Sequence, residues 1–242
     1  MPVGNRMIGI DRTIQLNWID SAVEMLLKGY TPEEIWIGLD PIIGSVLTGK
    51  DARRKCKTVI FRVWIKVPQE VESFRDEALG LMKSATKSER IVLHWIMCCV
   101  AYPFFRDFTA TLGKMLKLQD DINSQQVIRR IVEKYGERST AIRATQRLFV
   151  SLVNWGVITE TADKHKFSTD KIHRYKISEK IVPWMVEGVI RASGSKSISM
   201  ENIRLNPSLF PFDYEPTLSN ISTDGRFEIN RHALNENLIT LK

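Results

Sequence analysis

The 242-residue sequence lacks the short motifs on which common enzymatic chemistry depends. Glycine-rich phosphate loops, the nucleophile-elbow motif and the zinc-protease helix motif are absent. Acidic residues are plentiful, but their spacing predicts solvated helix faces and helix starts, whereas a nuclease needs carboxylates that converge on a metal. These absences exclude the familiar catalytic classes, and we expect a protein that is not an enzyme and needs no cofactor.

Cysteine is scarce, with only Cys56, Cys98 and Cys99 in the chain. An odd count, with two cysteines adjacent and no metal-ligand spacing, excludes a disulfide framework and fits a reducing, cytoplasmic setting. His94 and Cys98 lie four residues apart on one helical face, which is a possible pair of soft metal ligands. Because no second pair accompanies them and their neighbours are apolar, we expect core residues and no metal.

Long hydrophobic runs are also missing. The first residues contain no continuous apolar region of the kind that a secretory signal has. The most apolar run, residues 91–105, is interrupted by His94 and Pro103 and is shorter than the roughly 20 residues that a membrane helix needs. It predicts a buried core helix, and we expect a soluble cytoplasmic protein with no membrane partner.

What the chain does have is positive charge. Its formal net charge is +7 and its pI is about 9.3, which favours an acidic partner such as nucleic acid. Residues 129–180 contain twelve Lys or Arg against six Asp or Glu, so most of the excess lies in this segment. The partner is therefore expected to contact this part of the chain.

The same segment has the pattern of a winged helix-turn-helix. Residues 122–136 and 139–156 show apolar side chains at the three-and-four spacing of amphipathic helices, with Gly136 ending the first. Short β-prone runs follow at residues 157–160 and 173–178, and they predict a two-stranded wing with a basic tip. We expect the second helix to enter a DNA groove, as recognition helices do.

Outward-facing residues of the second helix and cations of the wing are the predicted DNA contacts. Guanidinium groups can bind guanine edges, and hydroxyl or amide groups can reach phosphates or bases. The predicted contacts are Arg138, Ser139, Thr140, Arg143, Gln146, Arg147, Lys164, Lys166, Lys171 and Arg174, with His165 and His173 on or near the wing. A winged helix used only for packing or protein contact is the alternative, and phosphate contacts alone would give the same charge signature.

The part before the winged helix reads as a succession of helices. Helical patterns cover residues 13–28, the segment after Thr31, and residues 51–65, 69–83, 88–100 and 103–118. The third of these is basic and amphipathic, which predicts either a second nucleic-acid surface or a helix that binds an acidic protein face. The cations of this possible surface are Arg53, Arg54, Lys55, Lys57 and Arg62.

The carboxyl-terminal part differs from the rest in its amino-acid composition and pattern. Residues 205–216 are apolar and bounded by prolines, which predicts an ordered strap across the helical body. Residues 220–230 predict a small hairpin with Asp224 and Gly225 in its turn. We therefore expect a mainly α protein with a helical body at 1–102, a winged helix-turn-helix at 103–194, and a strap with a short hairpin at 195–242.

A resemblance to a known family rests on three stretches: ERIVLHWIMCCVAYPFFRDF, QVIRRIVEKYGERSTAIRATQRLFVSLVNWGVI and the late LFPF. With them the chain resembles the BrxA-like small helical components of BREX phage-defence systems. The resemblance implies a helical amino-terminal body joined to a winged helix, double-stranded DNA binding without enzymatic activity, and work alongside other defence proteins. The longer tail, residues 195–242, leaves a relative from another defence locus open.

Two further functions fit the same sequence. One is an assembly adaptor whose helical body and carboxyl-terminal strap dock onto a larger enzyme of a defence complex. The other is a winged-helix transcriptional repressor, although no dimerisation zipper is present. The pattern of residues leaves the oligomeric state, the sequence preference and the choice between DNA and RNA undetermined.

Overall fold

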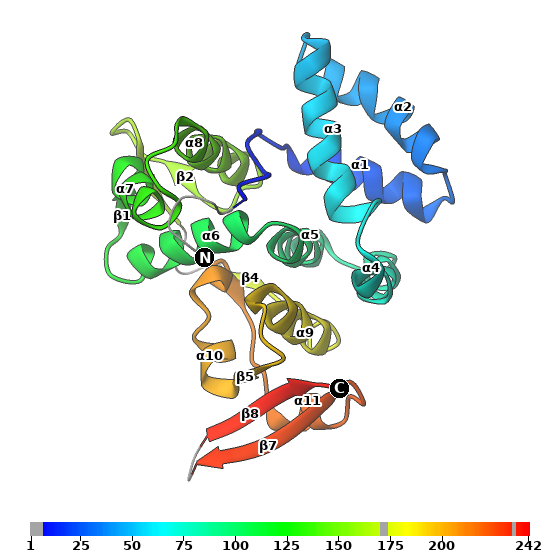
Figure 1. Ribbon diagram of the computed structural model, residues 1–242, viewed down its shortest axis with the longest axis vertical. Coiled ribbons are helices and arrows are strands. Elements are labelled where there is room, and N and C mark those ends of the chain that lie inside the picture. The colour runs from blue at the N-terminus through cyan, green and yellow to red at the C-terminus, as the bar shows by residue number, and fades with distance from the viewer. Residues whose placement is uncertain (1–6, 170–173, 234–235) are drawn as a thin grey trace.

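A computed structural model describes residues 7–169, 174–233 and 236–242. The protein is mainly helical, with small sheets in its second half (Figure 1). The helices are α1 (Leu16–Leu27), α2 (Pro32–Gly44), α3 (Lys50–Trp64), α4 (Gln69–Met82), α5 (Lys87–Ala101), α6 (Pro103–Leu116), α7 (Ser124–Tyr135), α8 (Ser139–Asn154), α9 (Val182–Ser193), α10 (Met200–Arg204), α11 (Leu218–Ser222) and the 3-10 turn η1 (Pro207–Leu209). The strands are β1 (Asp121–Asn123), β2 (Thr159–Glu160), β3 (Lys166–Ser168), β4 (Tyr175–Lys176), β5 (Ser197–Ser199), β6 (Phe212–Asp213), β7 (Phe227–Ala233) and β8 (Glu236–Leu241).

Helices α2, α3 and α4 begin within one residue of their predicted starts, whereas α1 begins at Leu16, three residues after its predicted start. Thr31 and Glu34 form a reciprocal capping box at the start of α2, which satisfies backbone N–H groups that the first turn would otherwise leave unpaired. Glycine and proline separate the helices, since Gly29 follows α1 and Pro68 precedes α4. Figure 1 shows α1, α2 and α3 grouped together on one side of the molecule.

Helix α5 lies at the centre of the core. Thr86 and Glu89 cap its start, and the residues between Ile91 and Cys99 are buried, as predicted for a core helix. Its Trp95 is fully buried and its ring lies edge-on to Phe105 and Phe212 at 5.2 and 5.4 Å. The most apolar run of the chain therefore supplies the packing centre of the fold.

His94, on the same helix, is a core residue with a specific partner. Its Nε2 lies 3.0 Å from Asp20 of α1, which also binds Arg90 at 3.1 Å. Burial lowers the pKa of His94, so the neutral ring donates to the ionised Asp20. Among the described residues, no three His, Cys, Asp or Glu side chains converge as a metal site would require.

Within the described ranges, no single helix is long and apolar enough to cross a membrane. Helices α5 and α6 reach the length and composition of a membrane-spanning helix only when taken together, and the chain bends by 119° at the break between them.

The segment from α6 to β3 has a defined order of elements: helix, strand, helix, helix and hairpin. Strand β3 pairs antiparallel with both β1 and β2, so the three-stranded sheet has the order β1-β3-β2. Ile122 of β1 lies opposite Phe167 of β3, and both side chains are buried. The sheet thereby closes onto helices α6, α7 and α8 (Figure 1).

The predicted second strand of this hairpin is wrong. The sequence placed it at 173–178, but the chain turns back earlier, at His165, whose φ is +66°, and Lys166–Ser168 pairs with β2. The cause is Phe167, which stacks on Phe149 of α8 with ring centroids 4.5 Å apart. Tyr175–Lys176 instead forms β4, which pairs in parallel with β6.

The sequence also placed the carboxyl-terminal hairpin too early. Leu218–Ser222 forms α11 with a capping box at Thr217, and Asp224 lies in the turn between α11 and β7. The hairpin itself is made by β7 and β8, and β5 pairs with β8. Arg226 fixes the start of this sheet, because it donates to Glu77 of α4, Glu187 of α9 and Asp224.

Helix α9, which was not predicted from the sequence, connects the core to this sheet. Pro183 is in its first turn, and Gly194, with φ +74°, ends it. Gly188 lets α9 lie close to α5, because a Cβ atom there would come within 2.1 Å of Ile96. Residues 207–212 also pack on α5, where Trp95 donates from Nε1 to the carbonyl of Ser208 at 2.9 Å.

Candidate nucleic-acid interface

Helix α8 presents a polar, positively charged face to solvent. Its buried side follows the predicted helical period and includes Ala141, Thr145, Leu148 and Leu152. The exposed residues near its amino end are Ser139, Thr140, Arg143, Gln146 and Arg147, which are five of the predicted contact residues. The sequence period alone therefore placed them correctly on the surface.

Arg143 and Arg147 carry the charge of this face. They lie one helical turn apart, and neither forms an ion pair with the residues that the structure describes. Arg138, which was predicted to join them, is half-buried and donates from Nε to the carbonyl of Tyr135 at 3.1 Å. Arg138 thus supports the turn between α7 and α8.

The exposed face continues beyond the residues that the sequence indicated. Val150 and Val153 are 52% and 38% exposed, and they follow Gln146 and Arg147 at helical spacing. An apolar surface patch next to cations can contact the methyl groups of thymine. The signal that could have identified these valines is their three-and-four spacing from the exposed polar residues.

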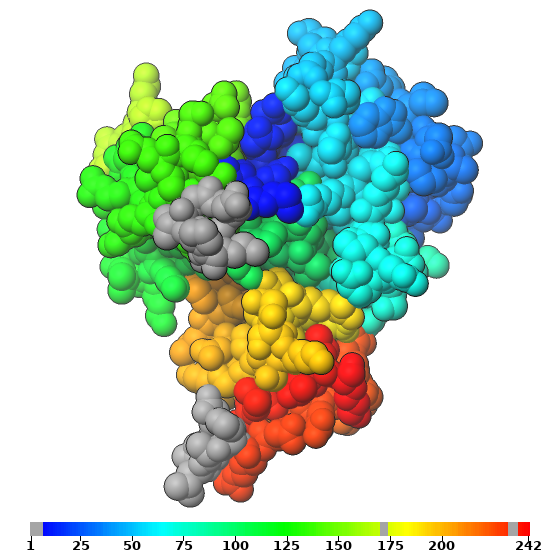
Figure 2. Space-filling model, in the orientation of Figure 1, coloured from blue at the N-terminus to red at the C-terminus, as the bar shows by residue number. Residues whose placement is uncertain are grey.

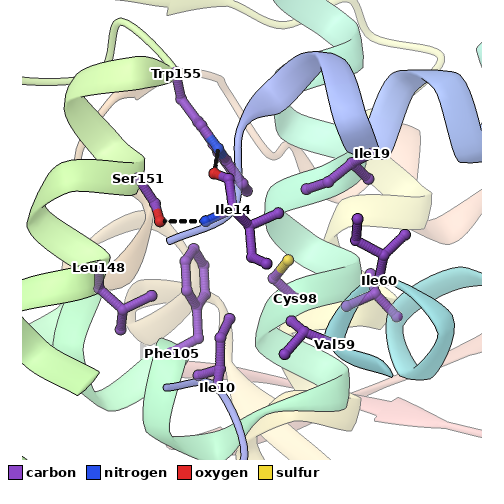
Figure 3. A pocket seen from close by; sticks show the side chains of 11 residues that line it. Ile10, Ile14, Ile19, Val59, Ile60, Cys98, Phe105, Leu148, Ser151 and Trp155 are labelled. Carbon is purple, nitrogen blue, oxygen red and sulfur yellow. Dashed lines mark hydrogen bonds between the residues drawn. The ribbon is translucent and has the colours of Figure 1, made fainter. Parts of the chain in front are cut away.

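The amino-terminal segment fixes the far end of α8. Ser151 accepts from the backbone N–H of Ile14 at 2.9 Å, and Trp155 donates to the carbonyl of the same residue at 2.9 Å (Figure 3). Around them the side chains leave a cavity of only about 10 Å³. Figure 2 shows this segment (blue) lying between α8 (green) and α3 (cyan), so helices distant in the sequence are held together.

Asp107 of α6 positions the helix before α8. Its carboxylate accepts from Tyr135 at 2.7 Å and binds Lys134 at 2.7 Å and Arg106 at 3.0 Å, although only 7% of the side chain is exposed. Burial by itself would raise the pKa of Asp107, but Lys134, Tyr135 and Arg106 outweigh it and hold that pKa below its ordinary value. The ionised form therefore stabilises the contact between α6 and α7.

Asp107→Asn is expected to lower the free energy of unfolding by about 2 kcal/mol at pH 7. A lowered folded-state pKa contributes stability above the unfolded pKa of about 4, and this contribution is lost as the pH falls through the folded pKa. The difference between variant and wild type should therefore shrink towards pH 3. Urea unfolding at several pH values measures it, and Asp163→Asn, an exposed ion-pair variant, is the control. A difference independent of pH would contradict the assigned role.

The hairpin of β2 and β3 presents fewer free cations than the sequence predicted. Lys164 and His165 are exposed at its tip, and Glu160 accepts from the backbone N–H of His165 at 3.1 Å. Lys166 is paired with Asp163 at 2.8 Å. Lys164 is thus the hairpin lysine that forms no ion pair with the described residues.

Two of the remaining predicted wing residues lie outside the described residues, namely Lys171 and His173. Arg174 is exposed, but it lies directly before β4, and the prediction that it stands on the hairpin is wrong. Burial raises the pKa of Tyr214, and the positive charge of Arg174 partly offsets that rise, so Arg174 lies near the carboxyl-terminal part.

Helix α3 has less available charge than its sequence indicates. Asp40 of α2 binds Lys57 at 2.7 Å and Arg53 at 3.2 Å, and Lys57 is 5% exposed, so Lys57 does not belong to a surface. Arg54 and Lys55 are exposed to a greater extent, but both bind Asp51, at 2.7 and 2.6 Å. Two of the five expected cations, Arg53 and Lys57, therefore hold α2 and α3 together.

Arg62 is the remaining cation of this set. It is exposed, and its guanidinium lies over the ring of Tyr102 at 5.2 Å from the centroid. The structure thus brings Thr140, Arg143, Gln146 and Arg147 together on one face, and it leaves Arg54, Lys55 and Arg62 on a separate helix.

Comparisons with known proteins add no further information on this surface. No protein-family model matches the chain, and no significant match is found among curated proteins or solved structures.

Proposed function

We propose that the protein is a non-catalytic, double-stranded DNA-binding protein in which residues from α6 to β3 form a winged helix. The order of elements and the β1-β3-β2 pairing support this assignment, because a helix, two further helices and a hairpin follow one another as they do in a winged helix. The observation that carries it is the pair of exposed arginines, Arg143 and Arg147, on a helix whose opposite side is fully packed.

In this proposal α8 enters the major groove. Arg143 and Arg147 bind base edges or phosphates, Thr140 and Gln146 make shorter polar contacts, and Lys164 at the hairpin tip binds the adjacent backbone. Arg138 contributes by supporting the α7–α8 turn. The resemblance to BrxA-like proteins supports the further proposal that this binding belongs to a bacterial phage-defence system, in which the protein is a cytoplasmic accessory component that works with other defence proteins.

Fluorescence anisotropy with a labelled duplex of about 25 base pairs tests the proposal directly. Binding should weaken linearly as the logarithm of salt concentration rises, because each neutralised phosphate releases a counterion. Single-stranded DNA and double-stranded RNA of the same sequence serve as competitors. Absence of duplex binding at low salt, with the protein folded, would rule out the proposed function.

Helix α3 is expected to contribute less than α8. Lys55 and Arg54 lower the pKa of Asp51 to about 2, so Asp51 stays ionised and offsets one of the two positive charges at any physiological pH. Arg54→Ala with Lys55→Ala should therefore weaken duplex binding by only about threefold in the same anisotropy assay. A loss as large as that of the α8 arginines would make α3 the principal binding surface.

An assembly adaptor is the second candidate function, and exposed apolar side chains near α2 favour it. Ile37 is 70% exposed, Val46 52% and Tyr30 45%, and such side chains are typical of protein contacts when they lie together. Co-purification from the native host with and without nuclease separates the two functions. Partners that remain after nuclease treatment and high salt favour the adaptor, whereas partners lost with the nucleic acid favour DNA binding.

A further inference from the structure

A second cavity lies away from α8, between α5, α6, α9 and the segment that includes η1. Its volume is about 140 Å³. Its wall is mostly apolar and includes Ile96 of α5, Ala110 of α6, Val189 of α9 and Ile198 of β5, while its uncharged polar residues are Ser193, Asn206 and Ser208. The hollow is open to solvent on one side and is larger than a water molecule, so a small molecule can enter it and fit there.

The charged groups of the cavity are both cations. Arg106 and Lys114 of α6 contribute to its wall, and no Asp or Glu is among the described residues that line it. Arg106 donates to Asp107 from Nε and Nη2 and to the carbonyl of Ala192, at the end of α9, from Nη1. Each of the two terminal nitrogens, Nη1 and Nη2, has a second N–H group that these hydrogen bonds do not use.

Lys114 is the more available of the two cations. It is exposed and forms no ion pair or hydrogen bond with the described residues. An ammonium group with three donors at the open side of an apolar hollow attracts an anion whose remaining atoms are apolar.

We propose that this cavity binds a small monocarboxylate with a compact apolar body, of about the size of benzoate. A cavity of about 150 Å³ engineered in another protein admits benzene, so about 140 Å³ accommodates one ring or a branched aliphatic group. The apolar body lies against Ile96, Val189 and Ile198, and the carboxylate binds Lys114 with Arg106 behind it. This binding does not depend on the DNA-binding function.

Methyl NMR on protein labelled at isoleucine and valine tests the site with benzoate as the probe. Titration should shift the methyl signals of Ile96, Val189 and Ile198 and leave that of Ile37, on the distant α2, unchanged. Benzamide, which has the same shape without the charge, should bind about tenfold more weakly, because a charge-assisted hydrogen bond is lost. Equal affinity for benzoate and benzamide would overturn the proposal.

Variants locate the binding. Lys114→Met keeps the aliphatic stem and should weaken benzoate binding about tenfold, whereas Lys117→Met, an exposed lysine just after α6 that does not line the cavity, should have no effect. Ala110→Met fills the hollow and should abolish binding while the circular dichroism spectrum shows a folded protein. If Lys114→Met and Ala110→Met both retain wild-type affinity for benzoate, the anion binds elsewhere. The same conclusion follows if affinity is lost only in the Arg143→Ala, Arg147→Ala double variant.

Discussion

Replacing Arg143 and Arg147 together with alanine is expected to weaken binding to duplex DNA by about 10- to 100-fold at physiological salt. Both guanidinium groups lie on the exposed face of α8, and no carboxylate among the described residues neutralises them. Their charge is therefore available to phosphates or to the guanine edge, where an arginine contact contributes about 1–3 kcal/mol. The fold should be unaffected, because neither side chain is part of the core.

The dependence on salt provides a second measurement of the same variant. If both arginines bind phosphates, the slope of log affinity against log salt should decrease in magnitude by about 1.8. If they bind bases instead, affinity should fall with a smaller change in slope and with altered sequence preference. Anisotropy titrations at several salt concentrations distinguish these cases.

A matched control removes the same charge elsewhere. Lys28→Ala with Lys83→Ala deletes two exposed lysines that follow α1 and α4, so the net charge changes equally. This protein should retain nearly the affinity of the wild type, because exposed charges more than about 10 Å from the bound DNA are screened. Equal losses in the two double variants would mean that net charge, and not α8, governs binding.

Helical periodicity explains why so much of the candidate site was predictable. In α8 the inward stripe and the exposed arginines follow from spacing alone, because a helix fixes the direction of each side chain along 3.6 residues per turn. The cap at Thr31, followed by Pro32 and Glu34, likewise marks the start of α2 by local chemistry. Information within one turn of a helix was sufficient for these features.

Features that depend on distant contacts were not predictable in this way. The second hairpin strand is fixed by Phe167 stacking on Phe149, 18 positions earlier, and the basic residue Lys57 is buried by Asp40 of another helix. Neither partner can be identified from local spacing, and the sequence of α3 therefore does not show that Lys57 is buried. The carboxyl-terminal sheet depends in the same way on Arg226 and its carboxylates in α4 and α9.

Trp95→Ala is expected to lower the free energy of unfolding by about 4 kcal/mol, the largest stability effect among the changes considered. The indole is fully buried and contacts Phe105 of α6, Trp155 after α8, and Phe210 and Phe212 of the carboxyl-terminal part. Its removal leaves a cavity at the meeting point of these elements and also leaves the carbonyl of Ser208 without its donor.

Trp95→Phe separates these two contributions. It retains most of the aromatic packing and loses only the hydrogen bond to Ser208, so it should cost about 1–2 kcal/mol. Urea unfolding followed by circular dichroism measures both variants. A loss below about 1 kcal/mol for Trp95→Ala would contradict the central position of this residue.

The Trp95→Ala variant also tests how α8 is held in position. Trp155 packs on Trp95 with ring centroids 6.3 Å apart and binds the carbonyl of Ile14, so the far end of α8 depends on the core for its position. At a temperature where Trp95→Ala remains folded, duplex affinity should still fall by about two- to fivefold, because a less fixed α8 loses more conformational entropy on binding. Unchanged affinity would show that the hairpin and α7 suffice to hold the DNA-facing half of α8, with the contact to Trp95 serving stability alone.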